Sequence, residues 1–333
     1  MDYNFHGGEI KDSIKYDYSV NINPLGMPDY VREAILSGID SYIVYPDRRS
    51  VRLRELIASR EKIAAEDVLC GNGASELIMA MMHAFDGKVA VMEPTFSGYE
   101  RAAIATGHDI CYYRSIGDID HSADIIFICN PGNPTGEIIE HDELISVVRK
   151  AKEQGVKVII DECFIDFTHE ESMSKLVDSL DNLIVLKALT KFYGMAGVRL
   201  GYICASHSIC EQVNSHLPEW NVSAIAEVAG VAAYSSGMDE WKDRTLTLID
   251  KEREYMLLEL KSMGIKVSDS KANFILCESE IPMYDRLLSQ GILIRDCSNF
   301  RTLDGSYFRV CVGKHESNQI LLDAIRGQLW QRR

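Results

Sequence analysis

The sequence predicts an α/β domain with a largely parallel sheet, joined to a smaller α+β domain. Between residues 68 and 204, short apolar runs alternate with segments of helical spacing, a pattern typical of parallel strands covered by helices on both faces. Beyond residue 238 the pattern changes, because a long charged helix leads into strands that follow one another closely. With 333 residues, 46% of them apolar, the chain can bury a core of this size.

The individual elements follow from the same periodicities. Seven apolar runs are the expected strands of the large sheet, at 68–70, 88–92, 109–113, 124–129, 157–160, 183–186 and 200–204. Helical spacing is clear at 29–37, 75–85, 142–154 and 239–263 and from residue 316 onward, and three later strands are expected at 272–277, 292–296 and 307–312. We expect the helix at 29–37 to pack with the C-terminal strands. The predicted large domain is 38–237, and the predicted small domain combines 1–37 with 238–333.

Composition limits the classes of binding partner and indicates the cellular compartment of the protein. The formal charge of −15 argues against nucleic acid or an anionic membrane as a partner, because both require a basic face. We find no signal peptide and no apolar run as long as a membrane span. The nine cysteines are odd in number and form no CxxC pair, which is typical of a reduced, cytoplasmic protein. No metal site is expected.

Lys191 is the residue with the clearest chemical signal. It follows the apolar run 183–186 and opens a glycine-containing loop, and an amine that is partly desolvated there can lose its proton near neutral pH. Asp161 ends another predicted strand thirty residues earlier, and Arg199 follows eight residues later. Together the three residues indicate a site for Schiff-base chemistry with a carboxylate and an anion-binding guanidinium nearby.

Two loops add candidate ligand contacts. The segment 71–76, Gly-Asn-Gly-Ala-Ser-Glu, follows a strand and opens a helix, so its N–H groups are suited to a phosphate; the alternative is a tight turn with Ser75 as N-cap. The segment 130–136, Asn-Pro-Gly-Asn-Pro-Thr-Gly, places Asn133 at the carboxyl end of a strand, where α/β folds bind ligands. Its alternative is a turn in which the asparagine caps its own backbone.

These motifs resemble the pyridoxal 5′-phosphate (PLP) enzymes of fold type I, the aspartate aminotransferase fold. The resemblance implies a mostly parallel seven-stranded sheet in the large domain. It implies that Lys191 forms the Schiff base with PLP, that Asp161 pairs with the pyridine nitrogen and that Asn133 contacts the phenolic oxygen. Phe96, in Pro-Thr-Phe-Ser-Gly-Tyr, corresponds to the ring that stacks on the cofactor. The residues matching the phosphate cup are Gly73, Ala74, Ser75, Thr190 and Arg199.

Other stretches resemble one branch of this family, which contains L-threonine-O-3-phosphate decarboxylase of cobalamin biosynthesis and histidinol-phosphate aminotransferase. The matching stretches are 6–8, 21–26, 161–167, 189–193, 292–300 and 303–310. In this branch Arg309 corresponds to the arginine that holds the substrate carboxylate, and Arg295 to the one that takes its phosphate. His6 and Asn23 would line the same pocket. Tyr45, in Tyr-Pro-Asp, resembles a tyrosine that reaches the neighbouring subunit's cofactor phosphate, which implies a homodimer.

The resemblance implies one of two reactions. The favoured one is decarboxylation of L-threonine O-3-phosphate to (R)-1-amino-2-propanol O-2-phosphate. The alternative is transfer of the amino group to 2-oxoglutarate, as in histidinol-phosphate aminotransferase. Phe164 favours decarboxylation, because aminotransferases commonly carry a hydrogen-bonding tyrosine there. The segment 195–197, Met-Ala-Gly, is closer to the aminotransferases, and Ala188 replaces a usual phosphate-binding Ser or Thr.

Overall fold

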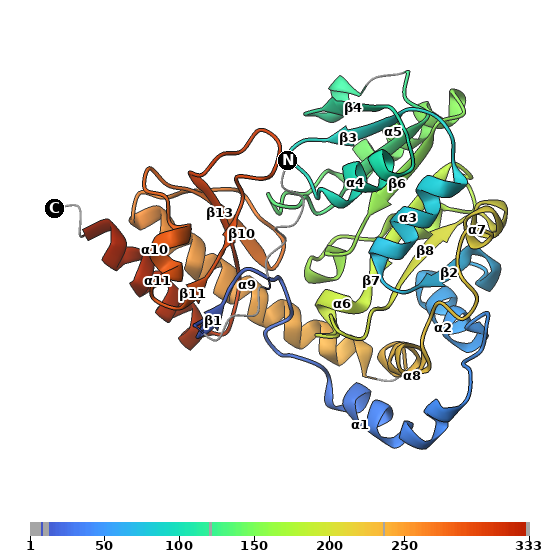
Figure 1. The fold of residues 1–333 in the computed structure, drawn as a ribbon, viewed down its shortest axis with the longest axis horizontal. Helices are drawn as coiled ribbons and strands as arrows, with labels where there is room; N and C mark the ends of the chain where they lie inside the picture. Colours follow the sequence, from blue (N-terminus) through green and yellow to red (C-terminus); the bar gives the residue numbers. More distant parts are fainter. Residues whose placement is uncertain (1–7, 9–12, 120–121, 236, 331–333) are drawn as a thin grey trace.

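The computed structural model describes residues 8, 13–119, 122–235 and 237–330, and its centre is a seven-stranded sheet (Figure 1). The strands are β2 (Val68–Gly71), β3 (Val89–Met92), β4 (Ile110–Tyr113), β5 (Ile125–Cys129), β6 (Lys157–Asp161), β7 (Leu183–Ala188) and β8 (Gly201–Ala205). They lie in the order β2-β8-β7-β6-β5-β3-β4. Within this sheet β8 runs antiparallel to the other strands, which are parallel to one another. The predicted fold class, with a mostly parallel seven-stranded sheet, is therefore confirmed.

The strands are apolar on both faces because helices cover both sides of the sheet. Along β5, Ile125 and Phe127 belong to one core cluster, and the intervening Ile126 and Ile128 belong to the other. The first cluster includes α3 (Ala74–Ala84), α4 (Gly98–Ala105) and α7 (His207–Asn214). The second includes α2 (Val51–Glu61), α5 (His141–Glu153) and α8 (Ala224–Ala233). We call this sheet with its helices the large part.

The C-terminal elements form a second unit, which we call the small part. Its antiparallel sheet has the order β12-β13-β10-β9, and β1 pairs in parallel with β11. The strands are β1 (Tyr16–Asp17), β9 (Lys266–Val267), β10 (Phe274–Glu278), β11 (Ile292–Leu293), β12 (Arg295–Asp296) and β13 (Tyr307–Cys311), and the helices are α9 (Met238–Ser262), α10 (Tyr284–Leu288) and α11 (His315–Trp330). In Figure 1, α9 reaches from these elements toward the large part. The predicted domain boundaries at 37/38 and 237/238 stay a prediction.

Two local expectations need correction. The strand expected at 292–296 is interrupted at Ile294, and its halves pair with different partners, β11 with β1 and β12 with β13. The helix expected to pack with the C-terminal strands, α1 (Asp29–Ser37), instead contacts α8 at the edge of the large part (Figure 1). The physical reason is the surface of α8, whose alanines, glycine and valines accept the apolar face of α1 around Val31.

Three further observations concern the described residues alone. No helix among them is long and apolar enough to cross a membrane. They contain no group of three or more His, Cys, Asp or Glu side chains placed to hold a metal ion. All nine cysteines fall within them; most are buried, and no disulfide joins any two.

Candidate active site

A cavity of about 560 Å³ lies between the carboxyl ends of the central large-part strands and the small part. It is lined by most of the residues that the sequence singled out, namely Ala74, Ser75, Phe96, Asn133, Asp161, Thr190, Lys191, Arg199, Arg295 and Arg309. Parallel strands end on the same edge of a sheet, so side chains that follow β5, β6 and β7 meet there. A cleft at this edge is the usual position of a ligand site in α/β folds.

Lys191 enters the cavity from α6 (Leu189–Phe192), a single turn that directly follows β7. Leu189 and Phe192 are buried and anchor this turn in the core, which fixes the position of the lysine between them. Burial lowers the pKa of Lys191, and the positive charges of Arg309 and Arg199 lower it further. The amine can therefore lose its proton more readily than an ordinary lysine, as a nucleophile or proton carrier must.

Asp161 lies at the end of β6 and is buried at the base of the cavity. Tyr99 donates a hydrogen bond of 2.6 Å to its Oδ2 atom, and the Cys163 N–H donates one of 2.9 Å to Oδ1. Burial raises the pKa of Asp161, and these two hydrogen bonds oppose the rise. Within the described residues no other acidic side chain lines the cavity. A carboxylate so placed fits a cationic partner such as a protonated pyridine nitrogen.

Tyr99 was missed by the sequence reasoning, although a signal was present. It lies one turn after Phe96 at the start of α4, so both rings face the cavity. The two rings meet edge to face, with centroids 5.5 Å apart. Arg101, on the same helix, also lines the cavity and was not predicted. Phe96 is thus held by a neighbour that also contacts Asp161.

The start of α3 forms a cradle suited to a phosphate. Gly73 is the N-cap residue with φ of 81°, and a Cβ atom there would lie 2.6 Å from Nη2 of Arg199. Only glycine permits this backbone and this close approach of the guanidinium group. No side chain of the described residues caps the helix, so the alternative of Ser75 as N-cap is wrong. The helix N-terminus and Arg199 together fit an anion such as the PLP phosphate.

The side chain of Asn133 is held by a residue of the small part. Arg309 donates a hydrogen bond to Oδ1 of Asn133, so the amide of this residue is oriented by the arginine and does not simply cap its own turn. The loop itself is closed by Asn130, whose Oδ1 accepts a hydrogen bond of 2.9 Å from the Ile139 N–H. The 130–136 loop therefore presents Asn133 to the cavity in a defined position.

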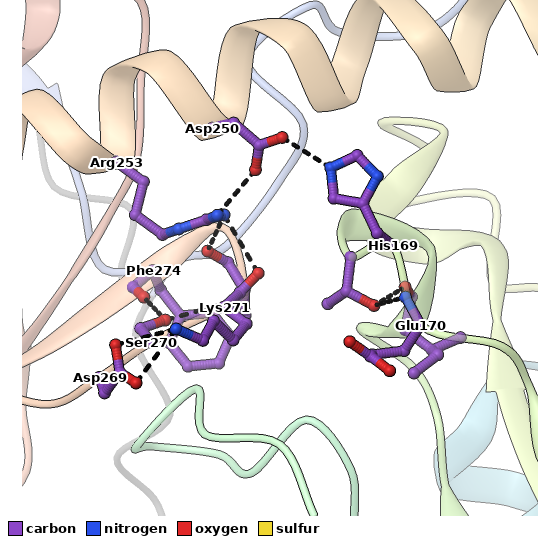
Figure 2. A network of polar contacts seen from close by, with 11 residues as sticks. His169, Glu170, Asp250, Arg253, Asp269, Ser270, Lys271 and Phe274 are labelled. Carbon is purple, nitrogen blue, oxygen red and sulfur yellow. Dashed lines mark hydrogen bonds and ion pairs between the residues drawn. The ribbon is translucent and has the colours of Figure 1, made fainter. Parts of the chain in front are cut away.

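A turn of the small part supports the far end of the same loop. Lys271 donates its N–H to the Gly136 carbonyl at 2.8 Å. Arg253 of α9 holds that turn by donating to the carbonyls of Lys271 and Ala272 at 3.1 and 3.3 Å (Figure 2). Asp250 accepts from Arg253 at 2.7 Å and contacts His169 of the large part at 2.8 Å (Figure 2). This polar network links the two parts beside the cavity.

Arg295 and Arg309 approach the cavity from directly paired positions on β12 and β13. Arg309 donates to the Ser19 carbonyl at 3.0 Å, and within the described part its buried Nε has no hydrogen-bond partner. Burial lowers the pKa of Arg309 to about 10 and also lowers the pKa of Arg295. Burying two guanidinium groups on paired strand positions costs free energy unless anions neutralise their charges. The pair therefore suits a ligand with two anionic groups.

Besides Gly73, which belongs to the cradle at the start of α3, three predicted residues lie outside the cavity lining or the described chain. Asn23 is a correction: its Nδ2 donates to the Phe192 carbonyl at 2.8 Å and to Thr245 at 2.9 Å, so its amide holds the turn next to Lys191. Asn21, two residues earlier, lines the cavity instead, and its buried Oδ1 has no partner among the described residues. Tyr45 is 78% exposed and stands away from the cavity of its own chain. His6 lies outside the described residues.

Comparison with known proteins agrees with this geometry. The sequence model of the aminotransferase class I and II family matches residues 13–325. The chain is 32% identical to threonine-phosphate decarboxylase of Salmonella typhimurium, covering 97% of this chain and 96% of the relative. It is 32% identical to histidinol-phosphate aminotransferase of Caldanaerobacter subterraneus, covering 94% and 92%. The crystal structure of histidinol-phosphate aminotransferase from Clostridium acetobutylicum superposes with a TM-score of 0.88 at 33% identity, covering 95% and 99%.

The family model spans nearly the whole chain, and both relatives are similar over almost their full length. Enzymes of this family depend on PLP, and the cavity offers a lysine, a buried carboxylate and a phosphate cradle that fit this cofactor. The chain belongs to the aminotransferase class I and II family, and its cofactor is pyridoxal 5′-phosphate.

Proposed function

We propose that this enzyme decarboxylates a phosphorylated amino acid, with L-threonine O-3-phosphate as substrate and (R)-1-amino-2-propanol O-2-phosphate as product. The observation that carries the proposal is the pairing of Arg295 and Arg309, two buried guanidinium groups that line the cavity together with Lys191. A substrate with a carboxylate at one end and a phosphate at the other supplies one anion for each arginine. The similarity to threonine-phosphate decarboxylase supports this substrate class.

The cavity residues divide into two groups in this proposal. Bound PLP supplies an electron sink for the electron pair left on the substrate Cα. Asp161 would hold the pyridine nitrogen in its protonated form, Asn133 would contact the phenolic oxygen, and Phe96 would pack against the ring, since all three side chains line the cavity. The phosphate of the cofactor is held by the start of α3 together with α6 and the loop before β8, through Gly73, Ala74, Ser75, Thr190 and Arg199.

Lys191 and the two arginines determine the reaction. Arg309 binds the substrate carboxylate through its Nε, which has no hydrogen-bond partner among the described residues, and Arg295 binds the phosphate beside Asn21. A role for His6 in the same pocket is implied by the family resemblance alone. With both ends fixed, the torsion about the substrate Cα decides which bond is broken. When the carboxylate is lost, the Cα–C bond breaks, CO2 leaves, and a proton is added at Cα. The lowered pKa of Lys191 allows its amine to take up and release that proton.

The alternative is an aminotransferase of the histidinol-phosphate type. The similarity to the Clostridium acetobutylicum structure favours it, as does the segment 195–197 of the loop before Arg199. In this reaction Lys191 removes the proton from Cα, and 2-oxoglutarate later accepts the amino group. Phe164 supports decarboxylation instead, because it lines the cavity with a ring that packs on Phe274 and has no hydroxyl to donate.

The deciding experiment uses PLP-loaded enzyme and L-threonine O-3-phosphate without a keto acid, and it follows CO2 release and the cofactor spectrum together. Many turnovers of CO2 release support the decarboxylase. A single turnover that converts the cofactor to its amine form, and that resumes when 2-oxoglutarate is added, would identify an aminotransferase and contradict our proposal. Lys191→Ala serves as the control, because it removes the amine and should abolish both outcomes.

We also propose a homodimer in which Tyr45 reaches the partner's active site. Tyr45 lies in an exposed apolar surface, where its ring meets that of Trp220 at 4.7 Å and Ile43 is 89% exposed. The other members of this surface are Leu36, Ile39, Val44, Val51 and Ile225. The segments that carry these side chains contact one another through α8, and exposed apolar side chains on neighbouring segments typically mark an interface. Sedimentation should give a dimer, and Ile43→Asp should give monomers, whereas Leu258→Asp, at an exposed leucine of α9, should not. A monomeric wild type would contradict the proposal.

A further inference from the structure

The loop between β12 and β13 contains two residues that contact the guanidinium group of Arg295. Asn299 accepts a hydrogen bond of 2.9 Å from Nη2 of Arg295, and the ring of Phe300 lies 5.2 Å below its guanidinium group. Phe300 also lines the cavity. The position of the Arg295 guanidinium therefore depends on the position of this loop, which belongs to the small part.

The next residue of the loop, Arg301, fastens it to the large part. Its Nε donates to Oε2 of Glu100 at 3.2 Å and its Nη2 to Oε1 at 2.5 Å, a two-pronged contact. The guanidinium group lies 3.9 Å from the ring centre of Tyr112, whose hydroxyl donates to Glu100 at 2.8 Å. The Glu100 side chain is only 6% exposed, and that of Arg301 is 34% exposed. A bidentate ion pair with one buried partner holds its geometry better than a pair in which both partners are exposed.

The helix that receives Arg301 is part of the active site. Glu100 lies on α4, between Tyr99, which hydrogen-bonds Asp161, and Arg101, which lines the cavity. The contact between Arg301 and Glu100 thus connects the loop that holds Arg295 to helix α4, which also carries Tyr99 and Arg101 of the cavity lining. We call Arg301, Glu100 and Tyr112 the clasp.

We propose that the clasp sets the affinity for the substrate phosphate by holding Arg295 in its binding position. This inference rests on the proposed function, in which Arg295 binds that phosphate. Arg301 and Glu100 are positioning residues, because neither lines the cavity and their contacts with one another and with Tyr112 act on the substrate through the loop and Arg295. When the clasp is opened, Asn299 and Phe300 lose their fixed position relative to the cavity, and Arg295 binds an anion less tightly. The cofactor cradle at Gly73 and Arg199 lies on other elements and keeps its affinity for PLP.

The test measures binding of inorganic phosphate to the PLP-loaded enzyme by calorimetry, so that the cofactor's own phosphate site is already filled. Arg301→Ala should weaken phosphate binding about tenfold, which corresponds to about 1.4 kcal/mol. Arg295→Ala should weaken it at least as much. The matched control is Arg326→Ala, because Arg326 is similarly exposed and forms an ion pair with Glu259 at 2.8 Å, away from the cavity. That control should bind phosphate like the wild type.

A second variant distinguishes loss of the Arg295 position from general destabilisation of the fold. Arg301→Ala leaves the buried Glu100 without this partner, whereas the double variant Arg301→Met with Glu100→Gln removes both charges. The double variant should still bind phosphate weakly, with a raised KM for the phosphorylated substrate, an unchanged kcat and an unchanged PLP affinity. Recovery of wild-type phosphate affinity in the double variant would overturn the clasp.

The remaining outcomes separate the clasp from the proposed function. If Arg295→Ala loses phosphate binding and Arg301→Ala does not, the clasp is wrong and the phosphate site stands. If the wild type does not bind phosphate, or Arg295→Ala binds it equally well, the assignment of Arg295 to the substrate phosphate fails, and the clasp fails with it. A fall in kcat without a change in KM would also contradict positioning of the phosphate.

Discussion

The hydroxyl of Tyr99 donates a hydrogen bond of 2.6 Å to the carboxylate of Asp161, joining helix α4 to the end of strand β6. The Tyr99 ring stacks on Phe127 at 4.7 Å and so is fixed before any ligand binds. This hydrogen bond opposes the effect of burial, which raises the pKa of Asp161. Tyr99 therefore helps to keep ionised the carboxylate that faces the cofactor site.

Tyr99→Phe should lower kcat/KM without unfolding the enzyme. The variant keeps the ring and loses the hydrogen bond, so the pKa of Asp161 should rise further and its carboxylate should hold a cationic partner less firmly. A hydrogen bond to a charged group contributes about 1.5–3 kcal/mol, so kcat/KM should fall at least about tenfold. The acid limb of the pH–rate profile should move to higher pH. An acid limb that stays in place would mean that Tyr99 does not act on Asp161.

Gly73→Ala should lower the affinity for PLP. The new Cβ would lie 2.6 Å from Nη2 of Arg199, which must then move away from the phosphate cradle. Titration of the apo enzyme with PLP should show a loss of about tenfold or more, since a charge-assisted contact is removed. Gly107→Ala is the control: its φ of 83° is nearly the same, but the new Cβ meets open space. Both variants should lose about 1 kcal/mol of stability, and only Gly73→Ala should bind PLP weakly. Equal PLP affinities would refute the cradle.

Glu162 should give the unfolding free energy a measurable pH dependence. Burial raises the pKa of Glu162 from its ordinary value of 4.5 to about 7. Between these pH values the folded state binds more protons than the unfolded state, so the free energy of unfolding should fall as the pH rises through this window. Glu162→Gln removes this contribution. Urea unfolding across the window should therefore show the wild type losing stability relative to the variant, and parallel curves would disprove the raised pKa.

Arg253→Ala should destabilise the link between the two parts that Figure 2 shows. The variant loses the hydrogen bonds that Arg253 donates to the carbonyls of Lys271 and Ala272 and to Asp250. We expect the free energy of unfolding to fall by about 2 kcal/mol, because the contacts are partly buried and involve a charged donor. Arg52→Ala, which removes an exposed contact with Glu55, should change it by less than about 0.5 kcal/mol. Similar losses in both would argue against a linking role.

Local sequence patterns determined the strands and the chemistry at their ends. The alternation of apolar runs placed all seven strands of the large sheet within a residue or two, because strands buried on both faces are continuously apolar. Lys191 and Asp161 could be found from the sequence, since Asp161 ends one such strand, Lys191 lies in the turn after the next, and the ends of neighbouring parallel strands meet. These features depend on residues that are close together in the chain.

The tertiary structure decided which side chains meet across long separations. Asn21 and Asn23 belong to one short motif, and only the path of the chain past the cavity distinguishes the lining residue from the one that holds the Lys191 turn. The pairing of Arg295 with Arg309 depends on strand register, and the contact of α1 with α8 depends on which apolar surface is left to cover. Such contacts join distant segments, so local periodicity carries no information about them; only the packing of the folded chain selects them.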